Sequence, residues 1–225
     1  RWAATTPALA AAARSTRPAT ASLADIGATR QRLDANRLLQ APRRIDTPQL
    51  VLCAPRPAWA PVFVESLNLS LPGLGFISWA QATRGVEWGG EFLQRDIEWV
   101  ARGEGLVFYA FQAVDGVYVG RVDLHSWDLD APRCEVGYVG DVRTAGRGLM
   151  REAVLACVDL AFTLGAARVQ ALSEAGNARA LHFAEHALGF TREGVLRNCE
   201  RDARGLLGDQ VLFAGYGASS TTPPG

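Results

Sequence analysis

The sequence predicts an α+β fold in which a mixed, mostly antiparallel sheet is covered by helices. Strand patterns dominate the first half of the chain, and helices and strands alternate in the second half. With 225 residues, 48% of them hydrophobic and 20% charged, the chain can bury one sizeable core. The formal net charge is zero, so no overall field attracts nucleic acid or a membrane surface, and neither is expected as a partner.

In the first half we expect a strand, a helix, a loop, a helix and two strands, at residues 48–56, 58–68, 70–81, 89–103 and within 106–127. The helix over 89–103 shows apolar residues at helical spacing and ends at Gly103. The dipeptide Asp115-Gly116 between two apolar runs is a strong hairpin signal. These strands are therefore expected to pair antiparallel.

In the second half we expect a strand, a helix, a strand, a helix and two strands, at residues 133–142, 149–164, 168–172, 177–187, 190–197 and 206–216. Apolar side chains recur at helical spacing from Leu149 to Leu164, and Gly165 follows as a helix stop. The later helix closes near Gly189. A helix between two strands allows those strands to run parallel.

The turn before the helix at 149 has the composition of a diphosphate site. Gly146 and Gly148 keep side chains away from the unpaired N–H groups at a helix start, and Arg143 and Arg147 add positive charge. A Walker A loop is excluded because the chain has no lysine. The Rossmann fingerprint fails because its third glycine would be Arg151. The alternative is a tight strand-to-helix turn without a ligand.

The spacing Arg143-x-x-Gly146-x-Gly148 lies within "CEVGYVGDVRTAGRGLMREAV", which is followed by "RVQAL", an asparagine and "LGFTREGVLR". In this order the motifs resemble the GNAT acetyltransferase superfamily, in particular its RimJ/RimL-like branch. The upstream segments "SLPGLGFISWA" and "FLQRDIEWVARGEGLVFYAF" resemble it too, so the likeness spans about residues 47–214. The resemblance implies a GNAT fold and an acyltransferase that moves an acetyl group from acetyl-CoA to an amine.

The resemblance also implies roles for individual residues. Main-chain donors of a coenzyme cradle are expected at Val142, Arg143, Gly146, Arg147, Gly148, Leu149 and Met150. Asn177 matches an asparagine that binds the pantetheine arm, and it equally suits a helix N-cap. Glu135 is the candidate catalytic base; the alternative is an acid that orients the substrate or pairs with an arginine.

Several residues are candidates for the acceptor side of the site. Trp79 and Tyr138 are the candidate substrate-binding residues, while Phe76, Trp99 and His125 are weaker candidates. Aromatic side chains are more often core residues, which is the alternative for all of them. His182 and His186 lie four apart on a helix, but without a third ligand we interpret them as a solvated face, and no metal is expected.

The chain departs from the family pattern at two positions. Where the branch carries a serine near the thiol this chain has Ala180, and where many members carry a tyrosine it has Ala184. One extra residue also precedes Leu188-Gly189-Phe190. The proton donor to the leaving thiolate is therefore unassigned. A non-catalytic CoA-binding module and an assembly protein on a GNAT scaffold remain alternatives.

The expected organisation is an N-terminal extension at 1–45, partly disordered or helical, a transferase domain at 46–216 and a disordered tail at 217–225. The extension has the composition of a transit peptide or of a loose bacterial extension. The four cysteines are expected to be buried thiols. No apolar run approaches the roughly 18 residues of a membrane span, and a cytoplasmic protein, possibly a homodimer, is expected.

The acceptor is a peptide N-terminus or a small amine. The cleft that faces Glu135 would distinguish the two. A narrow acidic slot would suit a small cationic amine, whereas an open groove would suit a peptide terminus.

Overall fold

A computed structural model describes residues 32–77, 79–80, 82–201 and 205–217. These residues form one eight-stranded sheet in the order β1-β2-β3-β4-β5-β6-β8-β7. The strands are β1 (Arg44–Asp46), β2 (Leu50–Cys53), β3 (Leu106–Gln112), β4 (Tyr118–Asp128), β5 (Arg133–Gly140), β6 (Arg168–Glu174), β7 (Thr191–Arg201) and β8 (Leu207–Tyr216). Only the β5–β6 pairing is parallel within this described sheet. The predicted mixed, mostly antiparallel sheet is confirmed.

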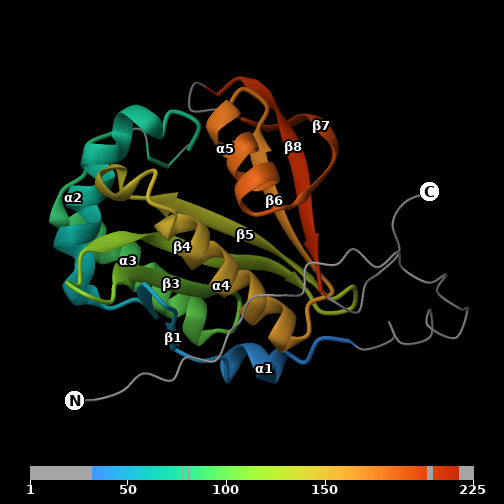
Figure 1. The fold of residues 1–225 in the computed structure, drawn as a ribbon, viewed down its shortest axis with the longest axis horizontal. Helices are drawn as coiled ribbons and strands as arrows, with labels where there is room; N and C mark the ends of the chain where they lie inside the picture. Colours follow the sequence, from blue (N-terminus) through green and yellow to red (C-terminus); the bar gives the residue numbers. More distant parts are fainter. Residues whose placement is uncertain (1–31, 78, 81, 202–204, 218–225) are drawn as a thin grey trace, which may run out of the picture. The chain divides into compact units, whose positions relative to one another are not determined.

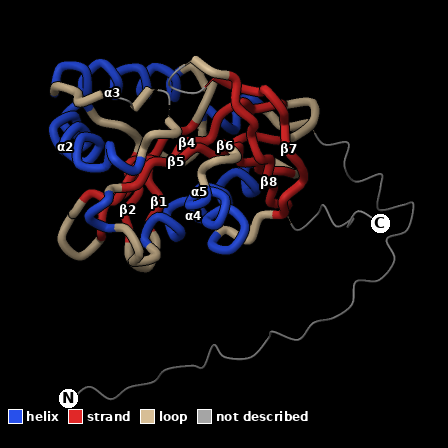
Figure 2. The backbone as a smooth tube through the Cα atoms, turned by 90° about the horizontal axis from the view of Figure 1, so that it is seen from above, coloured by secondary structure: helices blue, strands red, loops and turns tan. Residues whose placement is uncertain are grey.

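Helices cover both faces of the sheet (Figure 1; Figure 2). They are α1 (Ala35–Leu39), α2 (Ala60–Ser70), α3 (Val86–Ala101), α4 (Leu149–Leu164) and α5 (Ala178–His182). On one face α2 and α3 pack on an aromatic core that includes Phe63 and Tyr109. On the other face α4 packs its apolar stripe on the larger core, where Val154 and Cys157 are fully buried. The helical spacing predicted for 149–164 is thus the core-facing stripe of α4.

The hydrophobic core extends N-terminal of Ile45, where the sequence placed the start of the domain. Leu33, Leu38 and Ala41 are all buried in the larger core, and the guanidinium of Arg37 donates to the carbonyl of Leu164 at 2.9 Å. Residues 32–45 of the predicted extension therefore pack as part of the fold. The rest of the extension, residues 1–31, and the tail beyond Gly217 lie outside the described residues.

Strands β5 and β6 pair over only three positions and then separate (Figure 1). The last pair joins Glu135 to Gln170. Beyond it β5 runs on to Gly140 beside β4, while β6 runs on to Glu174 beside β8. The two strands thus open a V in the middle of the sheet. Peptide groups of β5 that face this gap have no strand partner on that side.

A π-helical turn at Phe183–Ala187 follows α5. A π turn contains one more residue than the α-helical turn it replaces. It therefore accommodates the extra residue that the sequence shows before Leu188. Ala184 lies in this turn and is 1% exposed, so its methyl group belongs to the core.

The cysteines do not all behave as predicted. Cys53, Cys134 and Cys157 are buried free thiols, but Cys199 is exposed. It lies on β7, the edge strand of the sheet, most of whose residues are exposed. Burial raises the pKa of both the Cys134 and the Cys157 thiol, which keeps them unreactive.

We expect a thiol reagent such as DTNB to modify one cysteine rapidly in the native protein and four in denaturant. Only Cys199 offers an accessible sulfur, because the other three lie in the core. Replacement of Cys199 by serine should remove the fast phase, as followed by absorbance at neutral pH. Fast labelling of two or more thiols in the native Cys199→Ser variant would contradict this packing.

Candidate active site

A cavity of about 570 Å³ lies at the mouth of the V. Its walls come from the end of β5, the turn before α4, the start of α4, the α5 region and the segment after α2. The residues that line it include Ser70, Leu74, Tyr138, Gly140, Val142, Gly146, Gly148, Leu149, Met150, Arg151, Asn177, Arg179, Ala180 and Phe183. Segments far apart in sequence therefore meet around one elongated space.

The turn before α4 divides its amides into two groups. Val142 donates to the Ser70 hydroxyl at 3.0 Å, and Arg143 donates to the Asp141 carboxylate at 2.7 Å. The amides of residues 144 and 145 close the turn on main-chain carbonyls. From residue 146 to residue 151, by contrast, no described protein group accepts the amide hydrogens. The predicted cradle is corrected accordingly: its donors begin at Gly146, and the amides of Val142 and Arg143 serve the turn itself.

Gly146 and Gly148 adopt left-handed backbone angles, with φ of 75° and 78°. A Cβ atom added to either would meet no atom within 4 Å, so both face open space. The start of α4 is held against the sheet because Met150 packs over two other glycines. A Cβ on Gly120 or Gly140 would lie 2.4 Å or 2.7 Å from Met150. The free amides and the positive end of the α4 dipole thus point at the cavity.

The side chains of Arg143 and Arg147 do not line the cavity. Arg143 binds Asp141 at 2.7 Å and Glu65 at 2.8 Å, and Arg147 donates to Gln112 at 3.0 Å. Burial raises the pKa of Asp141, but the hydrogen bonds from Arg143 outweigh it and hold that pKa below its ordinary value. Arg143 is therefore a brace for the turn.

Two other arginines supply the positive charge at this cavity. Arg151, on the first turn of α4, and Arg179, on α5, both line it. Their place at helix starts beside the glycine turn was the available signal, but the sequence did not distinguish them from other arginines.

Asn177 and Tyr138 both reach the coenzyme cavity, as we shall call the 570 Å³ space. The Asn177 carboxamide oxygen accepts from the amide of Ala180 at 3.1 Å, which makes it the N-cap of α5. Tyr138 lies on β5 with its ring 5.1 Å from that of Phe183. Burial raises the pKa of Tyr138 to about 12, so its hydroxyl keeps its proton at neutral pH. No described residue hydrogen-bonds this hydroxyl.

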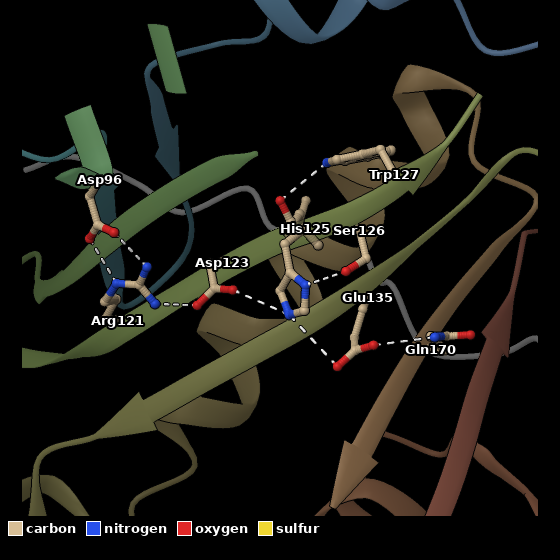
Figure 3. A network of polar contacts seen from close by, with 9 residues as sticks. Asp96, Arg121, Asp123, His125, Ser126, Trp127, Glu135 and Gln170 are labelled. Carbon is tan, nitrogen blue, oxygen red and sulfur yellow. Dashed lines mark hydrogen bonds and ion pairs between the residues drawn. The ribbon is translucent and has the colours of Figure 1, made fainter. Parts of the chain in front are cut away.

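Glu135 lies at the vertex of the V, in a row across three strands (Figure 3). It is paired with His125 on β4 and with Gln170 on β6. The Gln170 amide donates to Glu135 at 3.2 Å, and His125 Nε2 lies 3.7 Å from Glu135 Oε1. His125 Nδ1 lies 2.8 Å from the hydroxyl of Ser126. Ser126 has φ of 52° within a bulge of β4, a strained geometry of the kind that re-aims side chains at functional sites.

The row continues into a buried ion-pair network on the same face (Figure 3). Asp123 Oδ2 lies 3.6 Å from His125 Nε2, and its other oxygen is bound by Arg121. Arg121 also binds Asp96 on α3 at 2.7 Å. Burial opposes the charge of Arg121, but Asp123 and Asp96 hold its pKa well above the ordinary value. Because removing one partner of such a pair leaves a buried charge, the network fixes Asp123 and the face of β4 rigidly.

A second cavity of about 450 Å³ lies on this face, between α3 and β4. It is lined by Trp79, Arg84, Trp88, Phe92, Arg95, Trp99, Arg121, Asp123 and His125. Trp79 and Trp99 are therefore placed at a cavity, although their rings are also partly packed on the aromatic core. His125 joins this acceptor cavity, as we shall call it, to Glu135. Phe76 is 46% exposed and lines neither cavity.

His182 and His186 stack their rings 4.4 Å apart on the α5 side. In the described part of the chain, no group of three or more His, Cys, Asp or Glu side chains is arranged to hold a metal ion. None of the described helices is long and apolar enough to span a membrane.

Solved structures with the same architecture belong to acetyltransferases. The microcin C7 self-immunity acetyltransferase MccE, solved with acetyl-CoA and AMP, matches with a TM-score of 0.69 and 17% identity over 76% of this chain and 93% of its own. RimL, the ribosomal L7/L12 alpha-N-protein acetyltransferase in complex with coenzyme A, matches with a TM-score of 0.69 and 19% identity over 77% and 97%. A ribosomal-protein-S5-alanine acetyltransferase from Vibrio fischeri gives 0.65 and 17% over 80% and 99%. At these identities the likeness establishes the fold.

The sequence itself establishes the family. Residues 72–191, more than half of the chain, match the model of the acetyltransferase (GNAT) domain. The chain belongs to the GNAT acetyltransferases, enzymes whose co-substrate is acetyl-CoA. A search of curated proteins found no match.

Proposed function

We propose that this acetyltransferase moves the acetyl group of acetyl-CoA to a primary amine by direct attack of the amine on the thioester. The observation that carries the proposal is the run of free amides from residue 146 to residue 151, which opens on a cavity that leads toward Glu135. In this reaction a C–N bond forms and a C–S bond breaks. The amine gives up protons, and the departing sulfur takes one.

The coenzyme cavity fits the diphosphate and pantetheine arm of CoA. Gly146 and Gly148 leave open space for phosphate oxygens, and the α4 dipole favours negative charge there. The gap between β5 and β6 offers strand peptide groups to the amides of the pantetheine arm. Asn177 lines the same space while it caps α5.

Glu135 is the proposed base that takes the proton of the attacking ammonium. Its side chain is 18% exposed and its carboxylate is oriented by Gln170. His125, 3.7 Å away, lines the acceptor cavity and offers a route for that proton to solvent. Trp79 is proposed to contact the acceptor from the wall of the same cavity.

Tyr138 is proposed to replace the usual proton donors that Ala180 and Ala184 lack. Its hydroxyl is at the coenzyme cavity without a described partner, and burial keeps it protonated. It would donate its proton to the departing thiolate and regain one from solvent.

We expect Tyr138→Phe to lower kcat about 10- to 100-fold with little change in the Kd for CoA. Because the pKa of Tyr138 is about 12, the hydroxyl is protonated throughout pH 6–10 and the deficit should be constant over that range. Steady-state kinetics across pH 6–10 measures it. A deficit that varies with pH, or none at all, would exclude Tyr138 as the donor.

Thiol release from acetyl-CoA in the presence of an amine panel tests the proposed function, in a Cys199→Ser background so that the thiol reagent reports CoA alone. The panel contains peptides with free N-termini, aromatic amines, polyamines and aminoglycosides. Release that depends on one of these amines supports the enzyme. CoA binding with no turnover on any amine would favour a non-catalytic CoA-binding module, and absence of CoA binding would leave an assembly protein on this scaffold.

We also propose that the transferase is cytoplasmic and RimJ/RimL-like, that residues 46–216 carry the transferase domain, and that two chains can form a homodimer. The motifs of the RimJ/RimL-like branch support the second point. Light scattering of the full chain, and of a chain from which residues 1–31 are deleted, would measure the mass and any role of those residues in assembly.

A further inference from the structure

The acceptor cavity carries information about the chemistry of the acceptor itself, and this inference rests on the proposed function. Its lining sorts into aromatic rings (Trp79, Trp88, Phe92 and Trp99), guanidinium groups (Arg84, Arg95 and Arg121), one carboxylate (Asp123) and one imidazole (His125). The lining is therefore neither the acidic slot that a polycation requires nor an open polar groove.

The positive charges of this lining exceed the negative charges. Arg121 is neutralised by Asp96 and Asp123, and Asp123 is the only carboxylate that lines the cavity. Within the described residues, Arg84 and Arg95 lie within ion-pair distance of no carboxylate. Two guanidinium groups are thus left uncompensated at the wall of the cavity, and they favour an anion.

Arg84 is fixed in place before any ligand arrives. Its main chain is clamped to α2 by Asn68, which accepts from the Arg84 amide and donates to the Arg84 carbonyl, both at 2.9 Å. Its guanidinium lies 4.9 Å over the ring of Trp88 and donates to the carbonyl of Trp79 at 3.3 Å. Nε of Arg84 is buried without a hydrogen-bond partner, the one such side-chain atom among the described residues. A pre-placed guanidinium with unused donors suits a carboxylate or phosphate.

The aromatic wall is built for a flat partner. Phe92 lies between Trp79 and Trp88, with ring centroids 5.0 Å and 5.1 Å apart, and all three side chains are only partly buried. Arg95 lies 5.2 Å over the ring of Phe92. Half-exposed rings of this kind gain by stacking with a planar group, more than with a flexible aliphatic chain.

We propose that the acceptor is a small primary amine on a planar body that also bears a carboxylate or phosphate. The amine points to the Asp123, His125 and Glu135 side, the planar body lies along Trp79, Trp88 and Phe92, and the anionic group meets Arg84 and Arg95. Polyamines and aminoglycosides are disfavoured, because their additional positive charges would face these two arginines.

Four probe amines test the proposal by steady-state kcat/KM. They are 4-(aminomethyl)benzoate, benzylamine, p-xylylenediamine and 6-aminohexanoate, which vary the charge opposite the reacting amine or replace the ring by a chain. We expect 4-(aminomethyl)benzoate to exceed benzylamine about tenfold and p-xylylenediamine by more. It should also exceed 6-aminohexanoate about tenfold, because the aliphatic chain does not stack.

The variants Arg84→Gln and Arg95→Gln, singly and together, assign the preference to the arginines. The double variant should bring the ratio of 4-(aminomethyl)benzoate to benzylamine to about one, with benzylamine turnover changed less than about twofold. Arg43→Gln is the matched control, because Arg43 is exposed and lines neither cavity. If Arg84→Gln fails to fold, Arg95→Gln, at an exposed helix position, still reports the charge effect.

Two different failures can be told apart. Turnover of peptides, polyamines or benzylamine at rates equal to or above that of 4-(aminomethyl)benzoate would overturn the proposed acceptor class and leave the acetyltransferase function standing. The same holds for a charge preference that survives in the double variant. No thiol release with any amine would instead count against the proposed function itself.

Discussion

Replacement of Gly148 by valine is expected to raise the Kd for CoA at least about 100-fold. Gly148 has φ of 78°, a backbone region that costs a β-branched residue about 1–2 kcal/mol. Its added side chain would project into the space beside the free amides of residues 146–151. Loss of two hydrogen bonds to charged phosphate groups, at about 1.5–3 kcal/mol each, accounts for the change. Isothermal titration with CoA measures it.

Gly116 provides the control for this prediction. It has φ of 72° in the hairpin between β3 and β4, and an added Cβ would likewise meet nothing within 4 Å. Gly116→Val therefore carries the same backbone strain away from both cavities. The two variants should lose similar thermal stability while only Gly148→Val loses CoA. Equal Kd values for the two variants would mean that this turn does not bind the coenzyme.

Replacement of Glu135 by glutamine is expected to lower kcat by about 10²–10⁴-fold, because proton transfer by a positioned base contributes about this much. The Kd for CoA should stay within about twofold of the native value, since Glu135 does not line the coenzyme cavity. Glutamine keeps the size of the side chain at the vertex beside Gln170. Single-turnover kinetics with acetyl-CoA measures the chemical step directly.

The pH dependence of this deficit separates a base from an orienting acid. If Glu135 takes the ammonium proton, the deficit of Glu135→Gln should shrink as the pH rises and the acceptor amine loses its proton in solution. If Glu135 only orients the acceptor or His125, the deficit should be the same at every pH. Glu104→Gln is the control, since Glu104 is more than half exposed and pairs with Arg102.

Local signals in the sequence predicted most of the elements correctly. Gly116, with its positive φ, makes the predicted hairpin, and Gly165, with φ of 116°, ends α4 as expected. Both effects act within a few residues, so a sequence window contains their cause. The short edge strand β1 was missed because Arg44–Asp46 has no alternating pattern, and its partner β2 determines it.

The candidate site was predictable as far as its backbone determines it. The positive φ values of Gly146 and Gly148 follow from the residue type, and the free amides follow from the start of α4. The partners of long side chains were not predictable. Arg143 is held by Glu65, 78 residues away, and Arg121 by Asp96, 25 residues away. Such pairs depend on which elements the fold brings together, which no local pattern contains.

The contacts of the amides of residues 146–151 are the most direct test of the account. ¹H–¹⁵N correlation spectra recorded during a titration with CoA, and separately with pantetheine, isolate the contribution of the phosphates. We predict that CoA shifts the amide resonances of Gly146, Gly148 and Leu149 strongly, and that pantetheine, which lacks the phosphates, leaves them almost unchanged. Binding of CoA without movement of these resonances, or equal movement with pantetheine, would contradict a diphosphate site at the start of α4.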